Sequence, residues 1–393
     1  MTYCGSIKQN SLTKKEGKMR KRNLITMMIV LLVTVCSILR PFNTAQAEEK
    51  VYKWRCQSFL SAGFEWFDYK WAEALYVASG GRIQVKVFAG GEVVPTEDIL
   101  ESVASGMIEF GSSCPAYDAK KIDVANLLFG VPFAWNNRKQ DEQLIYVGGM
   151  LEIGREAYAE KGLRLLSIEP ADPYQLLSKK PANNLNELRA LKIRTTGGVA
   201  ELLKELGVKT TFVPFEEIYT NLATGVIDGI FVGGLGTYAQ SSWPEVAKYY
   251  YPQGFVNPLN CHRIMNKELW DSLPGDIKAI IQLVSEKQAV NSSYWNHAIT
   301  DIGAKVLEEK FNCKAIYWPE SDIKEIQKVA AKMMDQEAQK SERCARLVKI
   351  IKDYVYHGKY DAEREKMLSD KIWMHNYPLY EQANYKPETK EKE

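Results

Sequence analysis

The chain has 393 residues, of which 51 are Lys or Arg and 49 are Asp or Glu, so its formal net charge is +2. The basic excess lies at the N-terminus: after residue 47 there remain 43 basic and 48 acidic residues, a net charge of −5. Because the two signs are interspersed there, no surface for nucleic acid or an anionic membrane is predicted. This remainder is long enough for two lobes with separate cores and further helices.

Residues 1–47 have the pattern of a secretory signal peptide. A basic segment at residues 18–22 precedes the uncharged, mostly apolar stretch Leu24–Leu39, and residues 45–47 are Ala-Gln-Ala, a small-x-small cleavage site. The apolar stretch is shorter than the roughly 20 residues that span a bilayer. We therefore expect cleavage after Ala47 and a periplasmic location.

The sequence shows neither a cysteine framework nor a known catalytic motif. The cysteines after residue 47 are widely spaced: Cys56, Cys114, Cys261, Cys313 and Cys344. They form no C-x-x-C or Cys/His metal pattern, so buried free thiols are expected, with one or two disulfides as the alternative. Dinucleotide, serine-hydrolase, P-loop and zinc-protease signatures are all missing, and the histidines are scattered. The sequence predicts a protein that is not an enzyme.

The first half of the chain alternates predicted strands and helices. In order, these are a strand at Val51–Gln57, a helix at Glu65–Ala78, strands at Ile83–Phe88 and Ile108–Ser112, a helix at residues 141–160 and a strand at Leu163–Ile168. Cys114 and Tyr117 follow the Ile108–Ser112 strand. Tyr174 and Gln175 lie where the chain is expected to cross between lobes.

Residues 185–230 predict a βαβαβ unit with Arg194 at the carboxyl end of its first strand. Glycine at Gly207 and Gly225 suits the ends of the two helices. Ligands of open α/β units bind outside the carboxyl ends of the strands. An arginine there can hold a carboxylate through two parallel hydrogen bonds. The alternative is an ordinary surface arginine.

Two segments resemble each other within the chain. Pro95–Phe110 matches Pro214–Gly229, with proline, acidic residues, isoleucine and Ala-Ser/Thr-Gly in the same register. The match predicts two similar α/β lobes, and facing lobes enclose a cleft of the kind that binds small ligands. The alternative is chance similarity between two helix-turn-strand patterns.

The second half is dominated by helices. A second crossing is expected within Trp243–Pro258, and a helix from Pro274 to about Phe311 is too long for one lobe. Further helices are expected at Glu320–Gln339 and Arg346–Asp370, before a charged tail at Pro387–Glu393.

Between Val51 and Phe311 the chain contains, in order, the segments GGRIQVKVFAGGEV, PTEDILESVASGMIEFG, LRALKIRTTGG, VPFEEIYTNLATGVIDG and AKYYYPQGFVNPL. In order and spacing they resemble the periplasmic solute-binding subunits of TRAP transporters, the DctP-type family. They are nearer its oxoacid- or monocarboxylate-binding branch than its sialic-acid branch. The resemblance implies an α/β, two-lobed periplasmic binding protein fold (type II-like) with a long helix spanning both lobes and extra C-terminal helices.

This resemblance and the predicted elements together divide the chain. We expect a signal peptide at 1–47, lobe 1 at 48–172, lobe 2 at 173–256, a return crossing with the lobe-spanning helix at 257–319, and C-terminal helices with a charged tail at 320–393.

The resemblance also implies a set of ligand-binding positions. They are Arg194, Phe215, Tyr174, Gln175, Tyr117, Cys114, Gln57, Ser58, Phe231 and Asn257. Arg194 falls on the carboxylate-clamping arginine of the family, and Phe215 on the aromatic residue that lies over the ligand. Where the oxoacid branch has a metal-binding acidic or amide residue this chain has Phe231 and Val232, so neither a metal nor another cofactor is predicted.

With one arginine among mostly aromatic positions, the expected ligand is a monocarboxylate with an apolar or aromatic body. A second cation, from Arg55 or Lys179, would change that expectation. The implied partners are the organic acid and the membrane permease subunits of a TRAP transporter, and no nucleic acid. The C-terminal helices either form a homodimer or pack on their own lobes. A ligand sensor and a secreted enzyme remain alternative functions.

Overall fold

The computed structural model describes residue 28, residues 50–135 and residues 138–355. Apart from residue 28, the expected signal peptide lies outside these residues, as do its cleavage site after Ala47, the predicted helical segment beyond residue 355 and the charged tail. In the described part of the chain, no helix combines the length and apolarity needed to cross a membrane.

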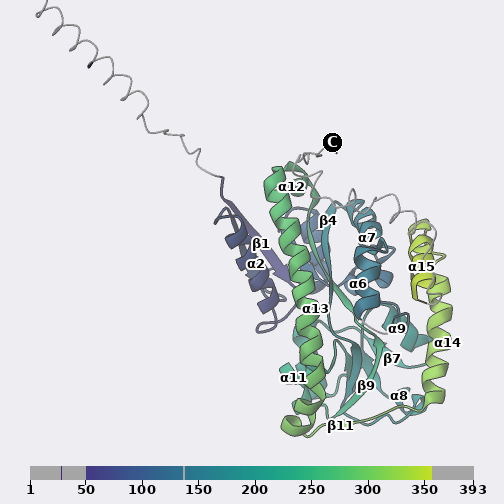
Figure 1. The fold of residues 1–393 in the computed structure, drawn as a ribbon. Helices are drawn as coiled ribbons and strands as arrows, with labels where there is room; N and C mark the ends of the chain where they lie inside the picture. Colours follow the sequence, from purple (N-terminus) through teal and green to yellow (C-terminus); the bar gives the residue numbers. More distant parts are fainter. Residues whose placement is uncertain (1–27, 29–49, 136–137, 356–393) are drawn as a thin grey trace, which may run out of the picture. The chain divides into compact units, whose positions relative to one another are not determined.

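The described strands form two sheets, each with helices around it (Figure 1). The first sheet has the order β2-β1-β3-β10-β4. Its strands are β1 (Tyr52–Ser58), β2 (Ile83–Phe88), β3 (Phe110–Ser113), β4 (Leu163–Pro170) and β10 (Asn260–Asn266). β1, β2 and β3 are parallel, whereas β10 runs antiparallel between β3 and β4. Helices α2 (Trp66–Ala78), α3 (Ile99–Ala104), α7 (Met150–Ala159) and α12 (Lys267–Ser272) pack around this lobe.

The second sheet has the order β11-β9-β5-β8-β6-β7. Its strands are β5 (Tyr174–Ser178), β6 (Lys192–Arg194), β7 (Lys209–Thr211), β8 (Gly229–Phe231), β9 (Tyr249–Val256) and β11 (Lys314–Ala315). The associated helices are α8 (Leu185–Leu188), α9 (Gly197–Glu205), α10 (Ile218–Thr224) and α11 (Leu235–Gln240). The parallel neighbours β7, β6 and β8 confirm the predicted βαβαβ unit.

The internal repeat appears as two copies of one local structure. Pro95 and Pro214 have almost identical backbone angles and precede the short 3-10 turns Thr96–Asp98 and Phe215–Glu217. Each turn continues into a helix, α3 or α10, and then into a strand, β3 or β8. Gly106 and Gly225 end the two helices with φ of 76° and 77°, a conformation that glycine adopts without penalty.

The structure adds to or differs from the predicted elements in three places. The single helix predicted at residues 141–160 is two helices, α6 (Arg138–Tyr146) and α7, because the chain turns at Gly149 with φ of 87°. The expected crossing at Trp243–Pro258 contains β9, which continues through the cis Asn257-Pro258 bond into the unpredicted β10. Several short helices were also missed: α4 (Pro115–Asp118), α5 (Ala125–Phe129), α8, α11 and α12.

The long helix is confirmed as α13 (Gly275–Phe311). It packs against β4 and α2 of the first lobe and against α11 of the second (Figure 1). Its contact with α11 is unusually close: a Cβ at Gly303 would lie 2.5 Å from the Leu235 carbonyl carbon, and one at Gly236 would lie 2.7 Å from Ile299. The absence of both side chains lets the two backbones touch.

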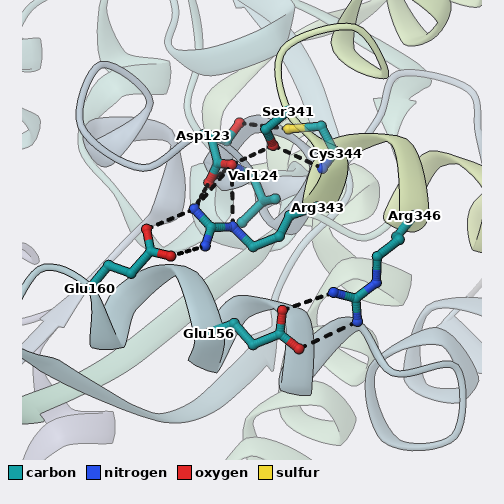
Figure 2. Close-up of polar contacts among 8 residues, drawn as sticks. All are labelled: Asp123, Val124, Glu156, Glu160, Ser341, Arg343, Cys344 and Arg346. Carbon is teal, nitrogen blue, oxygen red and sulfur yellow. Dashed lines mark hydrogen bonds and ion pairs between the residues drawn. The ribbon is translucent and has the colours of Figure 1, made fainter.

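The C-terminal helices α14 (Glu320–Glu337) and α15 (Glu342–Val355) pack on this chain's own cores. Figure 2 shows Arg343 joined to both Asp123 and Glu160, and Arg346 joined to Glu156 of α7. The five cysteines after residue 47 are free, as expected. Cys344 is one of them, and burial raises the pKa of its thiol.

Candidate ligand-binding site

Arg194 is the last residue of β6, and three strand ends of the second sheet meet beside it. β8 lies next to β6, with Ile230 opposite Arg194 and Phe231 as its last residue. β5 lies on the other side of β8 and runs antiparallel to it, so that its first residue, Tyr174, begins near the end of β8. This is the edge at which α/β sheets present ligands.

The Arg194 side chain is buried, with 1% of its surface exposed, and it spans the two lobes. Its Nε donates to the Val213 carbonyl (2.8 Å), Nη1 to the Phe231 carbonyl (3.3 Å) and Nη2 to the Tyr117 hydroxyl (3.3 Å). All three acceptors are neutral oxygens. Among the described residues, no carboxylate pairs with this guanidinium.

Three of the predicted residues besides Tyr117 are gathered around Arg194. Tyr174, Phe231 and Cys114 belong to one buried cluster. The Tyr174 hydroxyl shares a hydrogen bond with Thr196 Oγ1 (3.2 Å), and its ring lies 5.7 Å from that of Phe231. Burial raises the pKa of Tyr117 and of Tyr174, so both phenols stay neutral and leave the arginine charge uncompensated.

Other predicted positions are engaged with the backbone. Gln57 donates to the Ala89 carbonyl (2.6 Å) and accepts from the Val93 N–H (3.1 Å), which fixes the loop after β2. Ser58 accepts from the Leu60 N–H. Gln175 donates to the Pro252 carbonyl (2.7 Å) and accepts from the Leu235 N–H (2.9 Å). The polar atoms of these three residues position loops. The remaining predicted residue, Asn257, is half-buried and precedes the cis bond to Pro258.

Phe215 lies at a cavity of about 100 Å³ that residues of both lobes and of α13 line together. A chain of aromatic contacts connects it to the arginine: the rings of Phe212 and Tyr117 lie 5.8 Å apart, Tyr117 and Phe59 5.9 Å, and Phe59 and Phe215 6.1 Å. Phe212 lies 5.6 Å from the Arg194 guanidinium. Of the aromatic positions predicted from the sequence, Phe215 lines this cavity and Tyr117 lies between the cavity and Arg194, whereas Tyr174 and Phe231 do not line it.

The sequence interpretation missed the acidic side of this cavity. Asp68, Glu169 and Asp172 line it. Buried Arg263 of β10 pairs with Asp68 (2.8 Å) and Glu169 (3.2 Å) and stacks on Trp71. One residue could have indicated this acidic side from the sequence. Asp68 lies on the buried stripe of α2 with Trp71, Ala72 and Leu75, where an apolar residue would be expected.

Neither Arg55 nor Lys179, the two residues considered as a possible second cation, adds a positive charge beside Arg194. Arg55 is exposed and pairs with Glu109, and Lys179 donates to the Leu222 carbonyl (2.6 Å). No cluster of His, Cys, Asp and Glu among the described residues is arranged to hold a metal ion.

Comparison with known proteins gives the family. The model for "Bacterial extracellular solute-binding protein, family 7", DctP, matches residues 65–341. A monocarboxylate 2-oxoacid-binding periplasmic protein of a Nostoc species is 27% identical over 208 residues, 52% of this chain and 56% of its own length. The ectoine-binding periplasmic protein TeaA of Halomonas elongata is 29% identical over 159 residues, 39% of this chain and 46% of its own. The matched region thus spans about half of these relatives.

Solved structures share the fold. A TRAP periplasmic solute binding protein from Chromohalobacter salexigens with bound (S)-(+)-2-amino-1-propanol superposes with a TM-score of 0.73 at 24% identity, covering 77% of this chain and 95% of that one. One from Pseudoalteromonas atlantica with bound sodium and pyruvate gives 0.73 at 23% identity, covering 84% and 100%. Because the family model matches residues 65–341, which is most of the chain, the chain belongs to the DctP family of bacterial extracellular solute-binding proteins.

Proposed function

We propose that this protein captures a small organic acid outside the cytoplasm and delivers it to the permease of a TRAP transporter. One observation carries the proposal: the buried Arg194 guanidinium has only neutral protein partners in the described part of the chain. A buried charge without a counterion is costly, so a ligand carboxylate that supplies the counterion would be strongly bound.

The geometry suits a carboxylate. A guanidinium has five N–H donors, and three of those of Arg194 are used within the protein. One N–H on each terminal nitrogen remains, which is the pair that grips both oxygens of a carboxylate. Nη2 also donates to the Tyr117 hydroxyl of the other lobe, so residues of both lobes hold the guanidinium in place. The Nostoc relative, which is named as a monocarboxylate 2-oxoacid-binding protein, supports this ligand class.

The test is calorimetric titration of organic acids into the purified protein and two variants. Arg194→Ala should weaken carboxylate binding by about 2–5 kcal/mol. Arg194→Lys should recover little, because the planar fork is lost. Near-wild-type affinity of Arg194→Ala for every acid that binds would contradict the proposal.

The proposed partners are the acid and the permease, with the protein acting in the periplasm after signal-peptide cleavage. For the C-terminal helices, packing on their own lobes is favoured over a homodimer. Ile326, Ala330 and Met334 of α14 are buried within the chain, and α15 is held by the ion pairs in Figure 2. Sedimentation of the purified protein measures its oligomeric state.

A further inference from the structure

Two of the free cysteines, Cys114 and Cys261, lie opposite each other on neighbouring strands of the first sheet. β10 runs antiparallel to β3 with His262 opposite Ser113, and the same register one residue further places Cys261 opposite Cys114. Cys114 directly follows β3 and keeps an extended backbone, with φ of −131° and ψ of 129°. Directly opposite residues of an antiparallel pair have Cα atoms ~4.5–5.5 Å apart, within the ~4.4–6.8 Å that a disulfide spans.

The two thiols are in contact. The Cys261 thiol forms a hydrogen bond with Cys114, and Cys114 Sγ in turn donates to the Asn260 carbonyl (3.5 Å). Cys261 also packs against the buried cluster that contains Cys114. By contrast, the thiols of Cys313 and Cys344 donate to backbone carbonyls, at 3.7 Å and 3.3 Å. Sequence register and side-chain contact thus agree on one pair.

Reagents reach this pair through Cys261. Cys261 is half-buried and lines the cavity beside Phe215, whereas Cys114 is 5% exposed. Thiol–disulfide exchange needs a thiolate that the oxidant can reach, so Cys261 is the attacking thiol and Cys114 the resolving one. The hydrogen bond to Cys114, together with burial, raises the pKa of the Cys261 thiol. The exchange should therefore become faster as the pH rises toward that pKa.

We propose that Cys114 and Cys261 form a reversible disulfide when the folded protein meets a disulfide oxidant. The Cys261 thiolate attacks one sulfur of the oxidant, which gives a mixed disulfide and releases one thiol. The Cys114 thiolate then attacks the Cys261 sulfur, forms the Cys114–Cys261 bond and releases the second thiol. The protein loses two electrons and two protons, and the oxidant takes up both as two thiols. The oxidising compartment comes from the proposed function, whereas the contact between the thiols does not depend on it.

The disulfide would join two segments next to the binding region. Cys114 precedes α4, which carries Tyr117, and the Tyr117 N–H donates to the Cys114 carbonyl (3.0 Å). Cys261 lies in β10 shortly after the cis Asn257-Pro258 bond, where the chain passes from the second lobe to the first. Because the bond closes a long loop, it should lower the equilibrium constant for unfolding by about 30- to 1,000-fold, which urea unfolding of the oxidised and reduced proteins measures.

The test treats the folded, purified protein with oxidised glutathione at about pH 8, then unfolds it with an alkylating agent and maps its peptides without reduction. We expect a peptide pair that links Cys114 to Cys261 and that dithiothreitol converts back to two thiols, while Cys313 and Cys344 stay alkylated throughout. The urea-unfolded protein, treated in the same way, should give mixed pairings and shows that the oxidant is active. Alkylation of both Cys114 and Cys261 after treatment of the folded protein would overturn the proposal.

Serine variants separate the roles of the two thiols. In Cys114→Ser a glutathione adduct on Cys261 has no resolving thiol and should accumulate, whereas the buried thiol left in Cys261→Ser should react at least about tenfold more slowly. Cys344→Ser is the matched control, since Cys344 is buried and bonded to the Asp123 carbonyl, and it should form the disulfide like wild type. A wild-type protein that stops at the Cys261 adduct would refute the pair. These assays contain no acid ligand, so they succeed or fail independently of the Arg194 titrations.

Discussion

Among the described residues, two arginines are almost completely buried, and they have opposite surroundings. Arg263, in the sheet of the first lobe, touches the carboxylates of Asp68 and Glu169 and lies over Trp71. Arg194, in the sheet of the second lobe, touches two carbonyls and a phenol. Burial is the same for both side chains, with at most 1% exposed, whereas charge compensation is not.

The difference separates a structural arginine from a binding one. A guanidinium that already has its anions contributes to the folded state and has little to gain from a ligand. Neutral acceptors orient a guanidinium without neutralising its charge. An anion that binds there therefore gains the full electrostatic attraction. Burial alone would not have distinguished the two.

The matched variants Arg263→Met and Arg194→Met test this comparison most strongly. Arg263→Met leaves two buried carboxylates unpaired and should lower the free energy of unfolding by about 3–5 kcal/mol. Arg194→Met should cost at most about 1–2 kcal/mol without ligand, because removing an unpaired charge offsets the lost hydrogen bonds. Urea unfolding of the ligand-free proteins measures both values.

Two further measurements test whether unpaired carboxylates cause the loss of stability in Arg263→Met. The deficit of Arg263→Met should shrink at acidic pH, where the unpaired carboxylates take up protons. Combining it with Asp68→Asn and Glu169→Gln should restore much of the lost stability. If the two arginine variants lost the same free energy of unfolding, the different surroundings of Arg263 and Arg194 would have no effect on stability.

The pH dependence of stability should follow the carboxylates of the cavity. Burial raises the pKa of Asp172 and of Glu169 in the folded protein. A carboxyl group with a raised folded pKa contributes stability that is fully present below its unfolded pKa, ~4, and is lost as pH rises through the folded pKa. Asp172→Asn should remove its share of this loss, up to about 1.4 kcal/mol per pH unit within that window.

Urea unfolding of wild type and Asp172→Asn from about pH 4 to pH 8 checks this. Other buried groups titrate too, since burial raises the pKa of Asp118 to about 7 and of Asp141 to about 8 and lowers that of His262 to about 3. They are common to both proteins and cancel in the difference. Parallel curves for the two proteins would show that Asp172 is ionised in the same way folded and unfolded.

The smallest expected effect concerns Phe212, which is 44% exposed and lies over the Arg194 guanidinium. A cation–π contact at an exposed site is worth about 0.5–1 kcal/mol. Phe212→Leu should therefore weaken carboxylate binding by about twofold to fivefold. Phe88→Leu, which removes the contact between Lys86 and Phe88, should leave binding unchanged. A loss in both variants would indicate a general defect of the protein.

The sequence predicted the parts of the fold that depend on local signals. Gly207 and Gly225 marked helix ends, the repeat around Pro95 and Pro214 gave two equivalent turns, and the uninterrupted helical pattern from Pro274 gave α13 almost to the residue. These features need no knowledge of distant neighbours.

The missed features depend on distant neighbours. β10 is a strand because β3 and β4 flank it, although Asn260–Asn266 has weak strand character of its own. For the site, a strand end identified Arg194, but the absence of a carboxylate beside it is a three-dimensional fact. Asp68 lies far from Glu169 and Asp172 in the sequence, and only folding brings it to the same cavity.

The contact of Gly236 with Gly303 bears on how this binding site could change its selectivity. α11 supplies Thr237 and Gln240 to the cavity wall and rests directly on the backbone of α13. A single methyl group at Gly303 would have to push α11 away from α13, since it would lie 2.6 Å from the Leu235 carbonyl oxygen. The dimensions of the cavity can thus be altered by substitution at a residue that touches no ligand, a route by which related proteins could diverge in substrate size while keeping every binding group.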